Sequence, residues 1–140
     1  MPAGALILPA YHRLLKLAVL AALAVWPAAA RAQEPPDAAQ VQRGQRVFMY
    51  CSACHSLQPG QGDKIGPVLA GVVGAHAASR GDYDYSQALR QSGVVWTEEN
   101  LEKWLTKPGG LVPGTKMAFI GLPKPEDRAA VIAYLQAAGH

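Results

Sequence analysis

Two cysteines and a histidine stand together in the order Cys51-Ser52-Ala53-Cys54-His55. Residues three apart on a helix lie on one face, so both thiols can meet one edge of a flat ligand. The next residue can then present an imidazole nitrogen to a metal from the same side. This C-x-x-C-H spacing is the attachment pattern of c-type haem, whose vinyl groups form thioethers with the thiols. The stretch therefore predicts a covalent haem with His55 on its iron.

Three other cysteine chemistries compete for this stretch. A structural zinc site needs four ligands, but the sequence has no third cysteine and its other histidines stand apart from the motif. A thioredoxin-like dithiol follows a strand, whereas residues 42–50 lack strand alternation and contain good helix formers. A disulfide between Cys51 and Cys54 remains an alternative for the exported apoprotein, although so short a loop gains little stability from it.

The first 32 residues have the features of a secretory signal peptide. Basic residues between His12 and Lys16 precede ten consecutive apolar residues, Leu17–Trp26, and Ala30-Arg31-Ala32 fits a cleavage site. A membrane span takes about 20 apolar residues, so this run is too short for one. We expect residues 1–32 to be cleaved on export to the periplasm, which leaves a flexible segment, 33–40, and one domain, 41–140. An uncleaved N-terminal anchor is the alternative.

Removal of the leader changes the charge balance. The whole chain has 13 Lys and Arg against 10 Asp and Glu, a formal charge of +3. Arg13, Lys16 and Arg31 supply this excess, so residues 33–140 carry equal numbers of both signs. Nucleic-acid binding requires clustered basic residues, and we exclude it for this chain.

The rest of the sequence predicts an all-α fold with long loops. Helical spacing of apolar residues marks 38–52 and 98–106, Thr97 is a good N-cap, and Pro125 suits the first position of the last helix. Residues 86–92 fit a short helix that ends at Gly93. Residues 57–74 and 109–124 are rich in glycine and proline and predict loops. Loops beyond about 12–15 residues are uncommon in compact domains, so a large apolar cofactor at the centre would explain them.

A second iron ligand is expected from a methionine. Met1 is lost with the leader and Met49 lies on the helix of the motif, which leaves Met117. This residue follows His55 by 62 positions and ends the stretch Pro113-Gly-Thr-Lys-Met. A lone methionine is often core filler, but the Pro-Gly context favours ligation, and a thioether ligand raises the reduction potential.

Taken in order, these motifs resemble those of class I c-type cytochromes, in particular the mitochondrial-like branch of small soluble monohaem proteins, here bacterial and exported. The matching pieces, in the family's order and spacing, are Gly44-x-x-x-Phe48-x-x-Cys51-x-x-Cys54-His55, Gly66-Pro67-x-Leu69-x-Gly71, Tyr85-x-x-Ala88, Trp96-x-x-Glu99-x-Leu101, Pro113-Gly114-Thr115-Lys116-Met117 and Arg128 to Leu135. The resemblance implies the class I cytochrome c fold, with four to five helices and long loops wrapped around one haem c. It implies attachment through Cys51 and Cys54, axial ligation by His55 and Met117, and a crossing of the first and last helices at Gly44 and Phe48, near Tyr134.

The resemblance also implies roles for residues of the haem pocket. Pro67 corresponds to the proline whose neighbouring carbonyl orients the proximal histidine. Tyr85 and Trp96 correspond to a pair that hydrogen-bonds a buried haem propionate, and Thr115 to a hydroxyl residue on the methionine side.

Three positions depart from the family pattern. The arginine that usually follows the glycine at Gly74, near a propionate, is replaced by Ala75-His76, and His76 is either a substitute donor or a surface residue. Trp104 replaces the tyrosine beside the methionine sulfur, and its indole N–H donates but cannot accept. Leu89 replaces an asparagine, which makes the pocket drier and should raise the potential.

The resemblance implies a periplasmic one-electron carrier that is not an enzyme, because both axial positions are filled. The alternatives are an electron-transfer subunit of an exported oxidoreductase complex, or a haem enzyme or sensor with a labile Met117. Expected partners are a membrane oxidoreductase or terminal oxidase, or a periplasmic dehydrogenase, together with the cytochrome c maturation machinery. The chain is expected to be a monomer outside such a complex. Several positions of the family's lysine ring hold other residues here (Tyr50, Gly109, Gly110 and Pro123), so charge steering should be weak.

Overall fold

The computed structural model describes residues 37–139, so the expected leader, 1–32, lies outside the described residues. Within this range the chain forms five helices and no sheet, with one isolated bridge between His76 and Val95. The helices are α2 (Ala38–Ser52), α3 (Gln87–Gln91), α4 (Glu98–Thr106), α5 (Pro108–Leu111) and α6 (Pro125–Ala138). The predicted all-α fold is confirmed. None of these helices is both long enough and apolar enough to cross a membrane.

The helix ends follow local sequence. The Thr97 side chain accepts a hydrogen bond from the Asn100 N–H at 3.2 Å and caps α4, and Ser86 caps α3 in the same way. Pro125 occupies the first turn of α6, as predicted. Residues 38–40 form the first turn of α2, which agrees with the helix predicted over 38–52, so the segment 33–40 overlaps this helix by three residues.

One helix was missed. The sequence predicts loop throughout residues 109–124, but Pro108–Leu111 forms α5. Pro108 starts this single turn, since its fixed φ suits the first helical position and its missing N–H costs nothing there. Four residues are too few to show a helical period, so the pattern could not reveal it.

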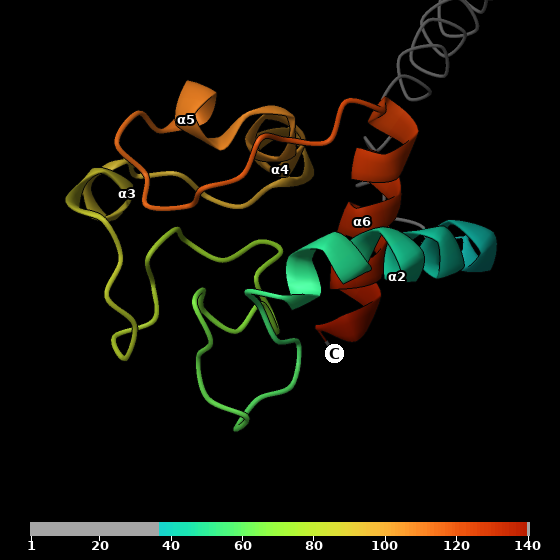
Figure 1. Cartoon of the computed structure of the whole chain (residues 1–140), viewed down its shortest axis with the longest axis horizontal. Coiled ribbons are helices and arrows are strands. Elements are labelled where there is room, and N and C mark those ends of the chain that lie inside the picture. Colours follow the sequence, from blue (N-terminus) through green and yellow to red (C-terminus); the bar gives the residue numbers. More distant parts are fainter. Residues whose placement is uncertain (1–36, 140) are drawn as a thin grey trace, which may run out of the picture. The chain divides into compact units, whose positions relative to one another are not determined.

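Helices α2 and α6 cross closely (Figure 1). Gly44 makes this possible, because a Cβ built there would lie 2.0 Å from the carbonyl oxygen of Ala130 and 2.6 Å from Cβ of Tyr134. Next to it, the rings of Phe48 and Tyr134 meet edge to face with centroids 5.5 Å apart. The expected crossing of the first and last helices is therefore present.

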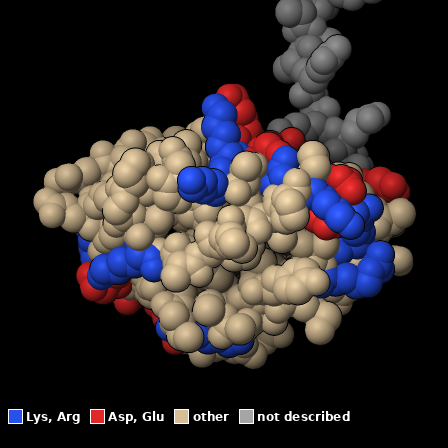
Figure 2. All heavy atoms as spheres, turned by 45° about the horizontal axis from the view of Figure 1, so that its top comes forward, with Lys and Arg blue, Asp and Glu red and all other residues tan. Residues whose placement is uncertain are grey.

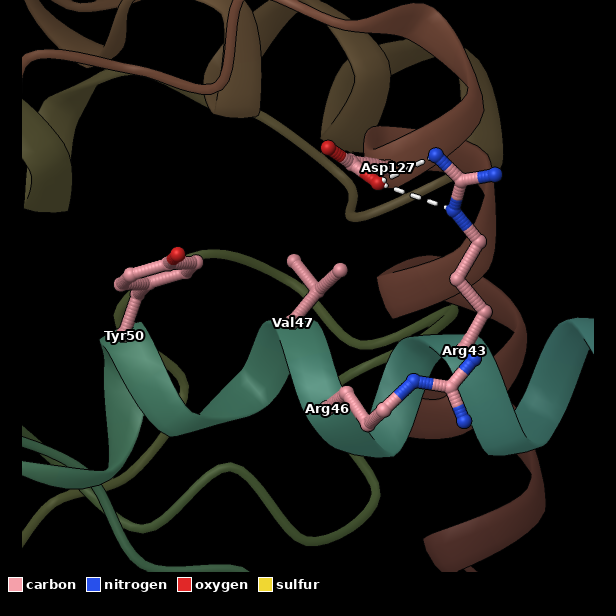
Figure 3. Close-up of a pocket in the computed structure, with 5 residues that line it drawn as sticks. All are labelled: Arg43, Arg46, Val47, Tyr50 and Asp127. Carbon is pink, nitrogen blue, oxygen red and sulfur yellow. Dashed lines mark hydrogen bonds and ion pairs between the residues drawn. The ribbon is translucent and has the colours of Figure 1, made fainter.

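An ion pair closes the outer side of this crossing. Arg43 reaches from α2 to Asp127 on α6 and donates through Nε at 2.9 Å and Nη2 at 2.7 Å (Figure 3). Beside it lies a surface recess of about 360 Å³, which Arg46, Val47 and Tyr50 also line. The guanidinium of Arg43 is already engaged by Asp127, so the recess offers no free pair of arginines to an anion.

A buried arginine ties α4 and α6 to the segment between them. Arg128 is 8% exposed. It donates to a Glu102 carboxylate oxygen at 2.6 Å and to the carbonyl oxygens of Leu122 and Pro123 at 2.6 and 3.0 Å. These bonds fix the chain path that follows Met117.

Candidate haem site

A cavity of about 540 Å³ lies inside the described domain, with apolar walls from α2, α3, α4, α6 and the segments between them. All the residues that the sequence assigned to the site line this one cavity. They are Cys51, Cys54, His55, Pro67, Tyr85, Trp96, Trp104, Thr115 and Met117. The fold thus brings together side chains that are up to 66 positions apart, while Met49 is 73% exposed and does not line the cavity.

The two cysteines stand at the C-terminal end of α2. Both are partly buried free thiols, and the N–H groups of Cys54 and His55 donate to the carbonyl of Cys51 at 3.0 and 2.9 Å. Burial, and secondarily the nearby Cys54, raises the pKa of Cys51 to about 11. This thiol is therefore protonated at neutral pH, unlike the activated thiolate of a redox dithiol. In residues 37–139 no three His, Cys, Asp or Glu side chains gather as a metal cluster.

His55 is buried and held in one orientation. Its Nδ1 lies 2.8 Å from the carbonyl oxygen of Pro67. A carbonyl only accepts, so Nδ1 carries the proton and Nε2 keeps its lone pair for a metal. Burial lowers the pKa of His55, the bond to Pro67 opposes this, and the charge of Lys64 lowers it further. The imidazole is thus neutral at pH 7, as a metal ligand must be.

Gly66 allows this arrangement of His55. A Cβ at Gly66 would lie 2.4 Å from Cε1 and 2.7 Å from Nδ1 of the imidazole. The Gly66 N–H also donates to the carbonyl of Cys54 at 2.8 Å, and Leu69 N–H to that of Ser56 at 2.8 Å. The loop after the motif is therefore laid flat against the histidine, where only glycine fits.

Met117 lies on a turn of the segment after α5. Thr115 N–H donates to the carbonyl of Val112 at 3.2 Å, and the backbone N–H of Met117 donates to Thr115 Oγ1 at 3.2 Å. Gly114 has φ +87°, a left-handed conformation that favours glycine. Pro113, Gly114 and Thr115 thus serve to fix the backbone from which the thioether enters the cavity wall.

Aromatic residues form another wall. Trp96 and Trp104 are each 7% exposed and meet edge to face with centroids 5.0 Å apart, with buried Leu89 also lining the cavity. Neither the Tyr85 hydroxyl nor the Trp96 indole N–H bonds to another described residue. They are two donors on a cavity wall that remain available to a ligand.

Sequence reasoning missed several lining residues, above all Arg80, Tyr83 and Phe119. Tyr83 donates to the carbonyl of Ile65 at 2.7 Å, which joins two loops. No periodicity marks these residues, because their positions depend on the path of loops without regular structure. The acidic residues Asp63 and Asp82 could have indicated a partner for Arg80. Their closeness to it becomes visible only when the positions of the loops are known.

The donor set fits a haem. Two thiols, a neutral imidazole with an available nitrogen and a thioether share a deep apolar cavity with a few polar donors, as a large cofactor site requires. Haem bound here would be held by Cys51, Cys54, His55 and Met117.

Comparison with known proteins agrees with this geometry. Residues 41–139 match the family model described as cytochrome c. The chain is 44% identical over 121 residues to a cytochrome c2 of Rhodomicrobium vannielii, covering 86% of this chain and 93% of that protein. It is 44% identical over 96 residues to a cytochrome c of Arabidopsis thaliana, covering 68% and 86%. The structure superposes on that of cytochrome cH from Methylobacterium extorquens with a TM-score of 0.66 at 40% identity, covering 69% of this chain and 97% of that one.

The chain therefore belongs to the cytochrome c family. Family membership together with the Cys51–Cys54 pair means that it carries one covalently bound haem c. It is a cytochrome c2-like electron carrier and not an enzyme, and its partners are other redox proteins.

Proposed function

We propose that the chain is a periplasmic carrier that moves one electron at a time, through a haem c ligated by His55 and Met117, after residues 1–32 have been removed. One observation supports this above all. His55 and Met117 come from segments 62 residues apart, yet both line the cavity that holds the two cysteines. A bound haem supplies the one-electron couple through its iron.

The protein's own residues control that couple. The Pro67 carbonyl keeps the His55 proton on Nδ1, and Leu89, Trp104 and Val131 exclude water from the cavity walls. A dry site favours the less charged reduced state and raises the potential. Side chains of α6 and the buried Trp96–Trp104 pair pack into these walls, so we expect little rearrangement on electron transfer.

The test is spectroscopic. Mature holoprotein should keep its haem on a denaturing gel, show a c-type reduced-minus-oxidised spectrum, and show the near-infrared band of ferric methionine ligation. Met117→Ala should retain the covalent haem, lower the potential and admit small ligands, whereas Met49→Ala should match the wild type. An unchanged potential in Met117→Ala would exclude Met117 as a ligand. His55→Ala should prevent stable holoprotein.

Export and cleavage of the leader can be tested separately from haem ligation. We propose that the mature chain begins at Gln33, since Ala30-Arg31-Ala32 precedes it. Mass spectrometry of the periplasmic fraction should give the mass of residues 33–140 plus one haem. A protein found only in the membrane fraction with its leader intact would support the anchored alternative.

A second candidate is an electron-transfer subunit of an exported oxidoreductase complex. Two apolar side chains on the cavity lining, Tyr50 and Ile65, are 74% and 79% exposed. In the view of Figure 2, most basic side chains lie beside acidic ones, and a wide area between them carries neither. Such a surface suits a stable contact better than long-range steering. Co-purification of the untagged chain with a larger subunit would favour this candidate, and its purification alone would favour the free carrier.

A further inference from the structure

Two side chains with a permanent positive charge line the cavity among the described residues: Arg80 and Lys116. The two side chains differ in how far they are exposed to solvent. The Lys116 side chain is 57% exposed and is engaged by the Asp84 carboxylate at 2.5 Å. The Arg80 side chain is 31% exposed. Arg80 is therefore the more enclosed of the two charges.

Arg80 is held rigidly between two carboxylates. Its Nη1 donates to Asp63 Oδ1 at 2.8 Å, and its Nη2 donates to Asp82 Oδ2 at 2.6 Å. Asp63 is fixed in turn, because its Oδ1 accepts the backbone N–H of Val68 at 2.9 Å. The guanidinium thus has one defined position on the cavity wall.

One donor of Arg80 remains unused. The bonds to Asp63, Asp82 and the Val68 carbonyl all come from Nη1 and Nη2, and Nε–H donates to no described residue. Tyr85 and Trp96, which line the same cavity, also keep a free donor. Three unused donors therefore line one cavity, and the charge of Arg80 also acts on the Tyr85 hydroxyl, so at least these two groups are near each other. Donors of this kind are what a carboxylate ligand requires.

Haem carries two propionate carboxylates, and a carboxylate enclosed by apolar walls needs a cation or several donors. We propose, given the haem site of the proposed function, that Arg80 is the cation that binds one propionate and keeps it ionised, while Asp63 and Asp82 orient it. His76 is the competing candidate, since it also lines the cavity, but it is exposed and no hydrogen bond positions it. Arg80 thereby supplies, from a later position in the same loop, the positive charge that is missing because Ala75 replaces the family's usual arginine.

The direction in which each substitution should shift the reduction potential follows from the charge that it removes. Reduction removes one positive charge from the haem, so a nearby cation favours the reduced state and a nearby carboxylate opposes it. Loss of the Arg80 charge should lower the potential, whereas loss of the Asp82 charge should raise it. A purely structural role of this ion pair would move the potential in the same direction in both variants.

The experiment measures the midpoint potential of holoprotein between pH 5 and 9 for Arg80→Gln, Arg80→Lys, Asp82→Asn and His76→Gln. Besides the propionate, the charged and titratable groups on this wall are Asp63, Asp82, His76, Tyr83 and Tyr85. At pH 7, Arg80→Gln should have a lower potential that rises as the pH falls, because reduction then draws a proton to the propionate. Arg80→Lys should restore most of the wild-type profile, Asp82→Asn should have a higher potential, and His76→Gln should match the wild type.

The assignment would be overturned by an Arg80→Gln profile identical to that of the wild type, or by an equal shift of the potential in His76→Gln. A common direction of shift in Arg80→Gln and Asp82→Asn would also reject it. Each variant is first checked for covalent haem and for the methionine–iron band. If the wild type lacks these, the proposed function fails; if they are present and Arg80→Gln is unchanged, only the role of Arg80 fails.

Discussion

Replacement of Gly44 by alanine should separate the two helices that form the main crossing of the domain. An added Cβ would lie 2.0 Å from the Ala130 carbonyl oxygen and 2.7 Å from its carbonyl carbon, whereas ordinary contacts begin at 3.4 Å. The obstacle is the backbone of α6, which cannot rotate aside as a side chain can. Phe48 and Val131, both buried, would lose part of their packing when the helices move apart.

Two effects of opposite sign decide the magnitude. Alanine is favoured over glycine within a helix by roughly 1 kcal/mol. Overpacking of a well-packed core costs about 1–3 kcal/mol, and a clash with backbone belongs at the upper end of that range. The net loss of unfolding free energy is therefore about 2 kcal/mol, which for a domain of this size lowers Tm by roughly 10 °C.

Denaturant unfolding of the ferric holoprotein, followed by far-ultraviolet circular dichroism, measures this loss. Gly109→Ala is the matched control, because Gly109 also lies in a helix, α5, and a Cβ there meets nothing within 4 Å. This control should be neutral or more stable by up to about 1 kcal/mol. If Gly44→Ala proves as stable as the wild type, the close approach of α2 and α6 at this glycine is wrong.

Three further predictions follow from the same contacts. Arg128→Ala should lower the free energy of unfolding by about 2 kcal/mol. The substitution leaves the Leu122 and Pro123 carbonyls without this donor and removes a partner from the half-exposed Glu102. An unchanged denaturation midpoint would contradict this. Gly66→Ala should displace the His55 ring and reduce the ratio of haem absorbance to protein absorbance in purified material, and normal haem loading with an unshifted spectrum would count against the geometry at Gly66. Electron transfer to an acidic redox partner should slow only modestly as ionic strength rises, because Lys116 is already paired with Asp84; stopped-flow rates that fall steeply with salt would refute weak steering.

The sequence predicted what short-range patterns control. Apolar spacing and caps located α2, α3, α4 and α6, because a helix depends on residues within one turn of each other. The haem attachment motif could be recognised for the same reason, because Cys51, Cys54 and His55 lie within five residues of the chain. The axial pairing of His55 with Met117 was suggested by elimination and family resemblance, and it remains a prediction even though both residues line one cavity.

The sequence could not predict what the loops bring together. Arg80 meets Asp63 across 17 residues, and Tyr83 meets the carbonyl of Ile65 across 18, with no regular element between them to set a register. Helix α5 could not be predicted because its four residues are too few to show a helical period. The sequence does not distinguish a donor from a surface residue at His76, because nothing in its local pattern indicates which way the loop faces.

These limits have a common physical origin in the way the domain is built. Helix α6 packs against α2 and α4, and α5 packs against α4, whereas α3 has no comparable contact with another helix in residues 37–139. Much of residues 65–85, together with Leu89 of α3, instead lines the cavity, so these side chains border the space for a cofactor as well as the helical core. A haem in that cavity takes the place of the helix pairings that would otherwise specify the loops. The residues that complete the fold on this side therefore also set the environment of the electron, and a substitution on these walls should change stability and potential together.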